Sequence, residues 1–340
     1  MIRRSVVVFS IIASLLLPAA KGAAAAGPVH VTIGTMRTVR NSVLFLAAER
    51  GYFKAEGLDV EMTAYKSDSD VVQALAGGGT DFALAGFTTA AFKYAGEGLI
   101  KAIAVQAREK QDYEGNQIVV SNAVYSRGLR KPEQLAGISA AIGQIGSVYH
   151  YQFAQLARVK GFGIDKITLK PQASLDAIAD AVSTGSVDAA ILPSNYARGL
   201  LTSNQAKLVS WYSEIDEQEL GALFVSAKLL KDKAKRATVE KFLRAYRKGA
   251  ADYHDALMHH DKYGKRVSDT RAHEAASEIA RYVFPLRAGG SALVENNSYY
   301  LDPNAQIDMV DLTRQVEWYK AQGLIDKKID AREIVDLKLD

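Results

Sequence analysis

The sequence predicts an α/β protein with two lobes, each a doubly wound and mostly parallel sheet, with a ligand cleft between them. The first observation is an internal repeat, in which Gly57-Leu-Asp-Val-Glu-Met-Thr and Gly78-Gly-Thr-Asp81 return as Gly163-Ile-Asp-Lys-Ile-Thr-Leu and Gly185-Ser-Val-Asp188. The second is the length of 340 residues, which suits two domains of ordinary size. Strand ends with ligand loops would then exist twice and face one another.

Each copy is predicted to contain strand, helix, strand, helix and strand in that order. Short apolar runs indicate the strands, as at Val31-Thr-Ile-Gly34 and Ser139-Ala-Ala-Ile-Gly143, and apolar spacings of three and four indicate the helices. In the first copy, Ser67-x-x-Asp70 is a capping-box pattern and Gly77 to Gly79 end the helix. The alternative is one large α/β sheet in which two similar units arose by ordinary βαβ patterning.

The N-terminus is predicted to be a signal peptide of residues 1–26. Arg3 and Arg4 precede an apolar run from Val6 to Leu17, and Ala24 to Ala26 offer a small-residue cleavage site. A transmembrane anchor is the alternative, but the run is shorter than the roughly 20 residues that a spanning helix needs. The chain has no cysteine, so neither a lipid-attachment thiol nor a disulfide is available. We therefore expect a periplasmic protein.

Export is expected to leave a mature chain that begins near Gly27, because Ala24-x-Ala26 is the best small-residue pair after the apolar run. Measurement of the intact mass in a periplasmic extract checks this expectation. A full-length, membrane-bound product would contradict it.

Composition excludes some partners. The formal net charge of +4 falls to +1 without residues 1–26, which contain Arg3, Arg4 and Lys21 and no acidic residue. The sequence shows no basic stripe and no Cys/His finger spacing, so we expect no nucleic-acid partner. We also expect a monomer.

The region after the second copy is predicted to be helical and to return to the first lobe. Apolar residues at helical spacing run from Val239 to Leu257 and from Met309 to Tyr319; we place Asp302 and Pro303 at the start of the latter helix and Gly323 at its end. Lobe 1 is then residues 27–119 plus 222–340, and lobe 2 is residues 120–221. The two crossings, near 117–121 and 221–226, would form a hinge.

Four segments together resemble a known family. They are Leu46-Ala-Ala-Glu-Arg-Gly-Tyr-Phe-Lys-Ala-Glu-Gly-Leu-Asp-Val, Lys131-Pro-Glu-Gln-Leu-Ala-Gly, Gly185-Ser-Val-Asp-Ala-Ala and Trp318-Tyr-Lys-Ala-Gln-Gly-Leu-Ile. Their order and spacing resemble the periplasmic solute-binding proteins of nitrate, sulfonate and taurine ABC importers, in the thiamine-pyrimidine-synthase-like superfamily. The resemblance implies a type II periplasmic binding protein fold, a small and usually anionic ligand, and delivery to an ABC permease with its ATPase.

The loops after the predicted strands hold the candidate ligand-binding residues, because ligands of open α/β sheets bind outside the carboxyl ends of the strands. Most of these loops offer a hydroxyl or amide at a helix start, where it either caps the helix or leaves that role to a bound oxyanion. The polar and glycine candidates are Thr38, Asn41, Ser42, Gly86, Thr88, Gly146, Ser147, Ser194 and Asn195.

Arg40 is the candidate anion clamp, because an arginine fork matches a carboxylate or sulfonate in two parallel hydrogen bonds. Arg37 is next in line, and solvated surface charge is the alternative for both. Aromatic residues in the same loops include the candidates Tyr65, Phe87, Tyr149 and Trp211. Some of them must be core. Several in the cleft would favour a ligand with an aromatic or extended apolar body.

Two other functional classes are weighed against solute capture for import. An enzyme of the same fold is disfavoured for two reasons. Related thiamine-pyrimidine synthases carry a cysteine-rich motif, and this chain has no cysteine. Related enzymes of menaquinone synthesis are cytoplasmic, and this chain has a predicted signal peptide. We expect no cofactor and no metal; His254, His259, His260 and Asp261 form a local run at a helix end rather than a convergent ligand set. A periplasmic sensor module that signals to a receptor stays open, because it uses the same clamshell.

Overall fold

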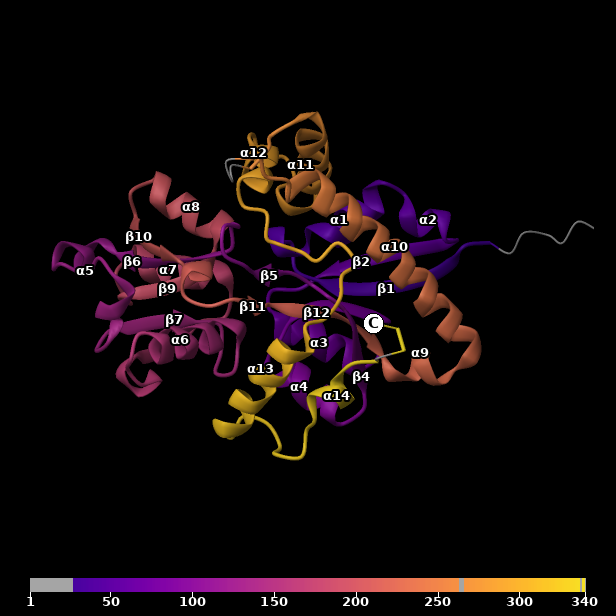
Figure 1. Cartoon of the computed structure of the whole chain (residues 1–340), viewed down its shortest axis with the longest axis horizontal. Helices are drawn as coiled ribbons and strands as arrows, with labels where there is room; N and C mark the ends of the chain where they lie inside the picture. Colours follow the sequence, from indigo (N-terminus) through magenta and orange to yellow (C-terminus); the bar gives the residue numbers. More distant parts are fainter. Residues whose placement is uncertain (1–26, 263–265, 337, 340) are drawn as a thin grey trace, which may run out of the picture.

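Two five-stranded sheets form the framework of the molecule (Figure 1). The computed structural model describes residues 27–262, 266–336 and 338–339, and the predicted signal peptide lies outside them. The first sheet has the order β2 (Leu58–Ala64), β1 (Val29–Thr35), β3 (Phe82–Gly86), β12 (Gly221–Ser226), β4 (Ile100–Val105). The second has the order β10 (Ala206–Trp211), β6 (Asn116–Ser121), β9 (Ala189–Pro193), β7 (Ser139–Ile142), β8 (Thr168–Pro171).

Each sheet is parallel except for one strand. In the first sheet β12 runs antiparallel to both β3 and β4, and in the second sheet β6 runs antiparallel to both β9 and β10. The central strand of each sheet, β3 or β9, is buried from end to end, which is why it appears in the sequence as a continuous apolar run. The predicted fold class, two doubly wound and mostly parallel sheets, is confirmed.

The internal repeat has the same hydrogen-bonding pattern in both sheets. Oδ2 of Asp81 accepts from the backbone N–H of Thr32 at 3.0 Å and from its hydroxyl at 3.2 Å. Oδ2 of Asp188 accepts from the backbone N–H of Ser139 at 2.9 Å and from its hydroxyl at 2.8 Å. The aspartate of the repeated Gly-x-x-Asp turn thus joins the start of one strand to its neighbour in each half, β3 to the middle of β1 and β9 to the start of β7.

Helices cover both sheets. Those of the first are α1 (Ser42–Glu49), α2 (Tyr52–Ala55), α3 (Asp68–Ala76), α4 (Thr89–Gly96), α9 (Ala227–Lys231) and α10 (Lys233–Leu257), with the short helix η1 (Val39–Asn41). Those of the second are α5 (Asn122–Ser126), α6 (Val148–Val159), α7 (Leu175–Ser183) and α8 (Ser194–Thr202), with η2 (Pro132–Leu135), η3 (Ile164–Lys166) and η4 (Tyr212–Glu214). The C-terminal region adds α11 (Thr270–Val283), α12 (Gly290–Glu295), α13 (Met309–Ala321) and α14 (Ala331–Ile334).

The last long helix begins later than predicted. Oδ1 of Asp302 accepts from the N–H groups of Asn304 and Gln306, so this residue closes a turn instead of starting a helix. Asp308 is the N-cap of α13, and its side chain accepts from the backbone N–H groups of Val310 and Asp311 in the first turn of the helix. Asp308 stands six residues after Asp302 and offers the same capping side chain, and the apolar stripe of the helix follows it directly. Gly323 ends the segment with a positive φ, as predicted.

The chain crosses between the two sheets twice, and each crossing comes earlier in the sequence than predicted. Residues 117–121 belong to β6 and residues 221–226 form β12, so both apolar runs are sheet strands. The crossings pass through β5 (Arg108–Glu109) and β11 (Gln218–Glu219), which pair antiparallel as a two-stranded sheet between the lobes (Figure 1). The division into two lobes stays a proposal. The strand order supports it, with the lobe boundaries at β5 and β11 instead of at residues 119–120 and 221–222.

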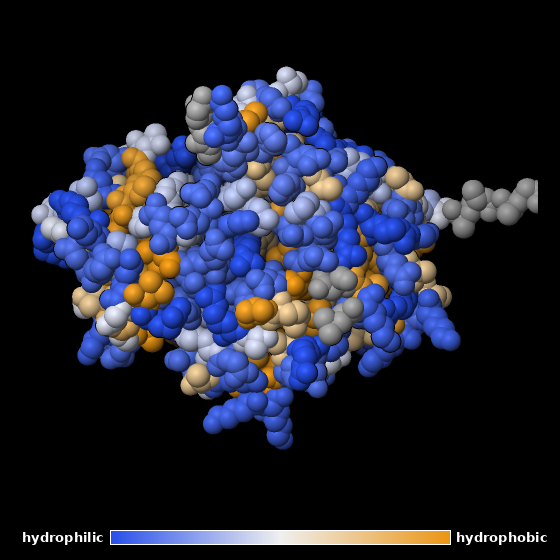
Figure 2. Space-filling model, viewed as in Figure 1, coloured by the Kyte–Doolittle hydropathy of each residue, from blue (hydrophilic) through white to orange (hydrophobic). Residues whose placement is uncertain are grey.

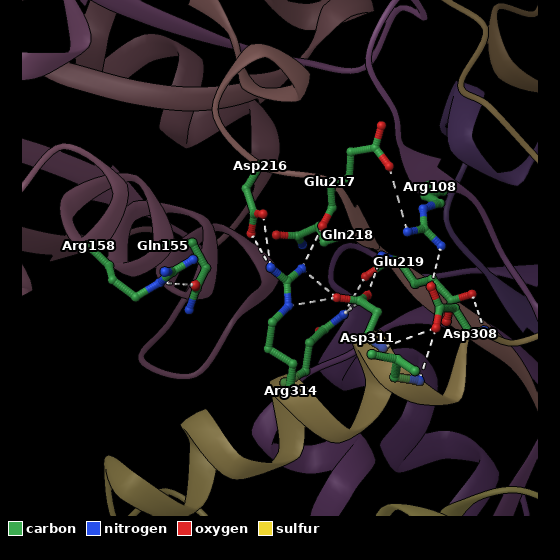
Figure 3. A network of polar contacts seen from close by, with 12 residues as sticks. Arg108, Gln155, Arg158, Asp216, Glu217, Gln218, Glu219, Asp308, Asp311 and Arg314 are labelled. Carbon is green, nitrogen blue, oxygen red and sulfur yellow. Dashed lines mark hydrogen bonds and ion pairs between the residues drawn. The ribbon is translucent and has the colours of Figure 1, made fainter.

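Helix α13 holds the second crossing through a polar network. Figure 3 shows Arg314 reaching from α13 to Asp216, whose Oδ2 lies 2.7 Å from Nη1, and to Asp311, whose Oδ1 lies 2.5 Å from Nη2. Asp311 in turn accepts from the backbone N–H of Glu219 at 2.6 Å. The backbone of β11 therefore has partners on a third element, which restricts how the crossing can bend.

The first crossing carries a carboxyl group that is fully buried. Oε1 of Glu109 accepts from the backbone N–H of Asn116 at 2.9 Å and from Nε2 of Gln152 at 3.4 Å, while Oε2 is buried with no hydrogen-bond partner within residues 27–262, 266–336 and 338–339. Burial raises the pKa of Glu109 to about 8, although the hydrogen bonds from Asn116 and Gln152 and the charge of Arg40 act in the opposite direction.

Glu109→Gln is expected to become more stable relative to wild type as the pH rises from 5 to 8. The folded protein keeps a proton on Glu109 up to a pKa of about 8, whereas the unfolded chain loses it near the ordinary value of 4.5. The stability that this proton contributes is complete below the unfolded pKa and is lost as the pH rises through the folded one. Thermal melts of both proteins across this range measure the difference, and parallel curves would contradict the expectation.

The surface is largely hydrophilic, and apolar residues gather only in small groups on the face that Figure 2 shows. Among the residues that the structure describes, no helix has the length and apolar character needed to cross a bilayer.

Candidate functional site

A polar cleft lies between the two sheets, at the carboxyl ends of their parallel strands. Its first cavity has a volume of about 230 Å³ and a second, of about 420 Å³, shares Met36, Lys66, Ser174 and Leu175 with it. The first is lined by Met36, Lys66, Ser67, Asp68, Ser69, Asp70, Thr88, Gly143, Gln144, Ser147, Val148, Tyr149, Gln172, Ala173, Ser174, Leu175 and Ile178. Both sheets therefore contribute to one cavity, as the sequence predicted for the two sets of loops.

Four helices begin at the wall of the first cavity. Their N-cap residues Ser67, Thr88, Ser147 and Ser174 all line it, two from each sheet. Each hydroxyl accepts the N–H of the residue three positions later, as in the 3.2 Å bond from Ala91 to Thr88. Thr88 and Ser147 thus cap their helices and also line the cavity, and ligand binding by them stays a prediction. The positive ends of four helix dipoles nevertheless converge on the cavity.

Arg40 is buried and paired with Asp68. Its Nη2 lies 2.5 Å from both carboxylate oxygens, and the two side chains are 2% and 12% exposed. Burial acts to lower the pKa of Arg40, but the charge of Asp68 and its hydrogen bond outweigh this and raise the pKa above its ordinary value. The solvated-surface alternative is therefore wrong for Arg40. Arg37 is exposed to solvent, as that alternative expects, but it also lines the second cavity.

Several predicted site residues contribute buried polar atoms that have no partner among the described residues. These atoms are Nε and Nη1 of Arg40, Oγ1 of Thr38, Oη of Tyr149, Oγ of Ser194 and Oδ1 of Asn195. Burial raises the pKa of Tyr149, so its phenol keeps its proton and can donate. Tyr149 lines the first cavity and Thr38 the second. Arg40, Ser194 and Asn195 line neither cavity, so Tyr149 and Thr38 are the members of this set that border one. Buried polar atoms are rarely left without a partner, so these atoms are candidates for contact with a ligand.

Four predicted residues are committed elsewhere, which corrects the sequence prediction. Nδ2 of Asn41 donates to the carbonyl of Met36 at 2.8 Å, and the hydroxyl of Ser42 donates to the carbonyl of Val39 at 2.5 Å. The ring of Phe87 packs in the core against Phe92 and Phe224. Trp211 ends the edge strand β10 and lines neither cavity.

The remaining predicted residues lie where the lobes meet. Tyr65 lines the second cavity. The carbonyl of Gly146 accepts from the N–H of Thr89 at 2.9 Å and from the Tyr319 hydroxyl at 3.2 Å. A Cβ on Gly86 would lie 2.7 Å from Val148, across the same interface. Loops of the two sheets are thus in direct contact.

Sequence reasoning missed part of the lining, above all the loop after β8. Gln172, Ala173 and Ser174 complete the second-sheet wall of the first cavity. The signal was present, because Ser174 stands before an apolar helical pattern as Ser67 does in the first copy. Applying the repeat to this loop finds it. The pairing of Asp68 with Arg40 had no local signal, since the residues are 28 positions apart.

Two mostly parallel α/β sheets with a polar cavity between them give the chain the periplasmic binding protein fold. The chain belongs to the NMT1/THI5-like family, whose model matches residues 40–256. No curated protein matches the sequence significantly.

Solved structures share the fold at low sequence identity. A ligand-binding component of an ABC-type import system from Staphylococcus aureus, with zinc bound, is 14% identical with a TM-score of 0.71 over 92% of this chain and 97% of that one. The alkanesulfonate-binding protein SsuA from Xanthomonas axonopodis pv. citri, bound to MOPS, is 18% identical with a TM-score of 0.69 over 92% and 99%. The nitrate-binding protein NrtA from Synechocystis is 13% identical with a TM-score of 0.68 over 91% and 85%.

The residues that the structure describes include no group of three or more His, Cys, Asp or Glu side chains placed to hold a metal ion. His254 lies on α10, and its ring packs edge-on against Tyr300.

Proposed function

We propose that this protein is the periplasmic substrate-binding component of an ABC importer, and that it captures a small organic anion, a sulfonate or carboxylate. It closes around the ligand and delivers it to a membrane permease with its ATPase. In this proposal the protein is a monomer, and it binds its ligand without transforming it. The family and the fold support the class of protein, and the chemistry of the cleft supports the class of ligand.

The observation that carries the anion proposal is the excess of donors around Arg40. Nε and Nη1 of Arg40 and the Tyr149 phenol are buried donors with no acceptor among the described residues. The hydroxyls of Thr38 and Ser194 can donate as well. Four helix N-termini point at the adjoining cavity and favour negative charge there. A carboxylate or sulfonate offers acceptors in the planar arrangement that an arginine fork fits.

Apolar groups beside these donors favour a ligand with an aromatic or extended apolar body. Leu175, Ile178 and Val148 line the first cavity, and Tyr65 and Tyr196 line the second. Apolar walls with a few placed polar groups are typical of small-molecule sites, where the polar groups orient the ligand.

Binding is expected to shift the protein from an open to a closed form, because contacts such as Thr89 to Gly146 exist only when the lobes meet. A panel of alkyl and aryl sulfonates and carboxylates, screened by thermal shift, identifies a ligand; native mass spectrometry of protein purified from periplasm adds any retained molecule. Small-angle scattering with the selected compound is expected to show a smaller radius of gyration. An unchanged radius at saturation would contradict closure, and stabilisation only by cationic compounds would contradict the anion class.

A further inference from the structure

Asp68 joins the three loops of the first sheet that face the cleft. It is the first residue of α3, in the loop after β2, and its Oδ1 accepts from the backbone N–H of Gly86 after β3 at 2.7 Å. Both its oxygens accept from Nη2 of Arg40, which lies in the loop after β1. The side chain is only 12% exposed although it stands at a helix start beside Asp70. Such a residue determines how Arg40 is presented to the cleft.

Arg40 and Asp68 together carry no net charge, but the guanidinium keeps N–H donors that Asp68 does not use. Asp68 occupies Nη2 of the guanidinium, while Nε and Nη1 stay buried and without a partner among the described residues. The other charges at the walls of the two cavities also balance, with Arg37 and Lys66 against Asp70 and Asp176. The donors therefore suit an acceptor group, but the cleft as a whole supplies no surplus of positive charge.

We propose that Asp68 is a specificity-determining residue that limits the ligand's acceptor group to a single negative charge. This inference rests on the proposed function and narrows its ligand class. One negative charge is stabilised by the Arg40 donors and the helix N-termini. A second negative charge on the ligand would lie close to the Asp68 carboxylate, because both groups would contact the same guanidinium. The site is buried, so water does not screen the two like charges and they repel strongly. Carboxylates, sulfonates and sulfate monoesters fit this limit, and phosphate monoesters at alkaline pH do not.

Phenyl sulfate and phenyl phosphate test the limit, because they have the same shape and differ in charge. The second pKa of a phosphate monoester is about 6, so phenyl phosphate is mainly a dianion at pH 8 and mainly a monoanion at pH 5. Calorimetry on the wild-type protein at pH 8 is expected to show at least about tenfold tighter binding of phenyl sulfate. Lowering the pH to 5 is expected to reduce this preference about tenfold.

Asp68→Asn removes the charge and keeps an oxygen for the N–H of Gly86. It is expected to reduce the preference for phenyl sulfate at pH 8 at least about tenfold. Asp70→Asn is the matched control, because Asp70 lines the same cavity on the same helix but bonds to Ser67 instead of Arg40. Asp70 is exposed to water, which screens its charge, so its removal is expected to change the preference less than Asp68→Asn does. A merely structural role for Asp68 would weaken both probes alike and leave their ratio unchanged.

The outcomes separate the two proposals. Equal binding of both probes to the wild type at pH 8, or an unchanged ratio in folded Asp68→Asn, would overturn the role of Asp68 and leave anion capture intact. If neither probe binds the wild type at either pH, the role of Asp68 fails, and the panel of sulfonates and carboxylates decides the anion class separately. Circular dichroism checks that Asp68→Asn is folded, and if it is not, Asp68→Ser, which also removes the charge, makes the same comparison of the two probes at pH 8.

Discussion

Arg40→Ala is expected to lower the free energy of unfolding by about 3–5 kcal/mol and to weaken binding of the selected anion about ten- to a hundredfold. The stability loss arises because Asp68, 12% exposed, keeps its charge in a site that no longer offers a cation. The affinity loss arises because Nε and Nη1 are buried donors that have no acceptor in the part of the chain that the structure describes. Chemical denaturation measures the first effect, and calorimetry at a temperature where the variant is folded measures the second.

Two further variants show whether these effects belong to Arg40. Arg37→Ala removes an exposed cation from the same loop and is expected to change stability by less than about 0.5 kcal/mol. Arg40→Lys restores a positive charge near Asp68 but cannot reproduce the planar fork, so it is expected to recover stability more than affinity. Unchanged affinity in folded Arg40→Ala would move the anion site away from this residue and make Arg37 the next candidate.

Gly146→Ala is expected to weaken ligand binding by about 1–3 kcal/mol, which is roughly five- to a hundredfold in affinity. A Cβ there would lie 1.9 Å from Oγ1 and 3.0 Å from Cβ of Thr89 in the opposite lobe. The Thr89 side chain is β-branched and has few rotamers with which to move away. The lobes must therefore separate slightly, which removes the contacts that only the closed form makes. Calorimetry with the selected anion measures the loss.

Gly185→Ala is the matched control for backbone strain. Gly185 has a φ of +74° and Gly146 a φ of +77°, so a side chain costs similar strain at both. Nothing lies within 4 Å of a Cβ at Gly185. Both variants are expected to lose stability, but only Gly146→Ala should lose affinity beyond that. Equal affinities in the two variants would show that the contact between Gly146 and Thr89 is not part of the bound state.

The fold could be predicted because its signals are local and occur twice. A buried parallel strand needs a continuous apolar run, and a helix start needs a capping side chain, so Ala189 to Pro193 and Ser67 identify their elements without reference to distant residues. The start of α13 was misplaced because Asp302 and Asp308 are both good caps. Local chemistry does not choose between them, and packing of the apolar stripe does.

The site could be predicted only as a set of loops. Strand ends in a doubly wound sheet must carry the ligand, and this rule places Thr88, Ser147 and Tyr149 at the cavity. It cannot say which side chains turn inward. Asn41 and Ser42 stand in the right loop, yet both are occupied by hydrogen bonds within their own lobe.

The sequence by itself determined the two similar halves, the elements of each and the loops that meet at the cleft, because backbone propensity and apolar periodicity act over a few residues. Only the tertiary structure decided the state of Arg40, because its charge is balanced by Asp68, 28 residues away and on another strand's loop. It also decided the positions of the crossings, where Arg108–Glu109 and Gln218–Glu219 pair across more than a hundred residues. Contacts of that range depend on how whole elements pack, and no local pattern in the chain encodes them.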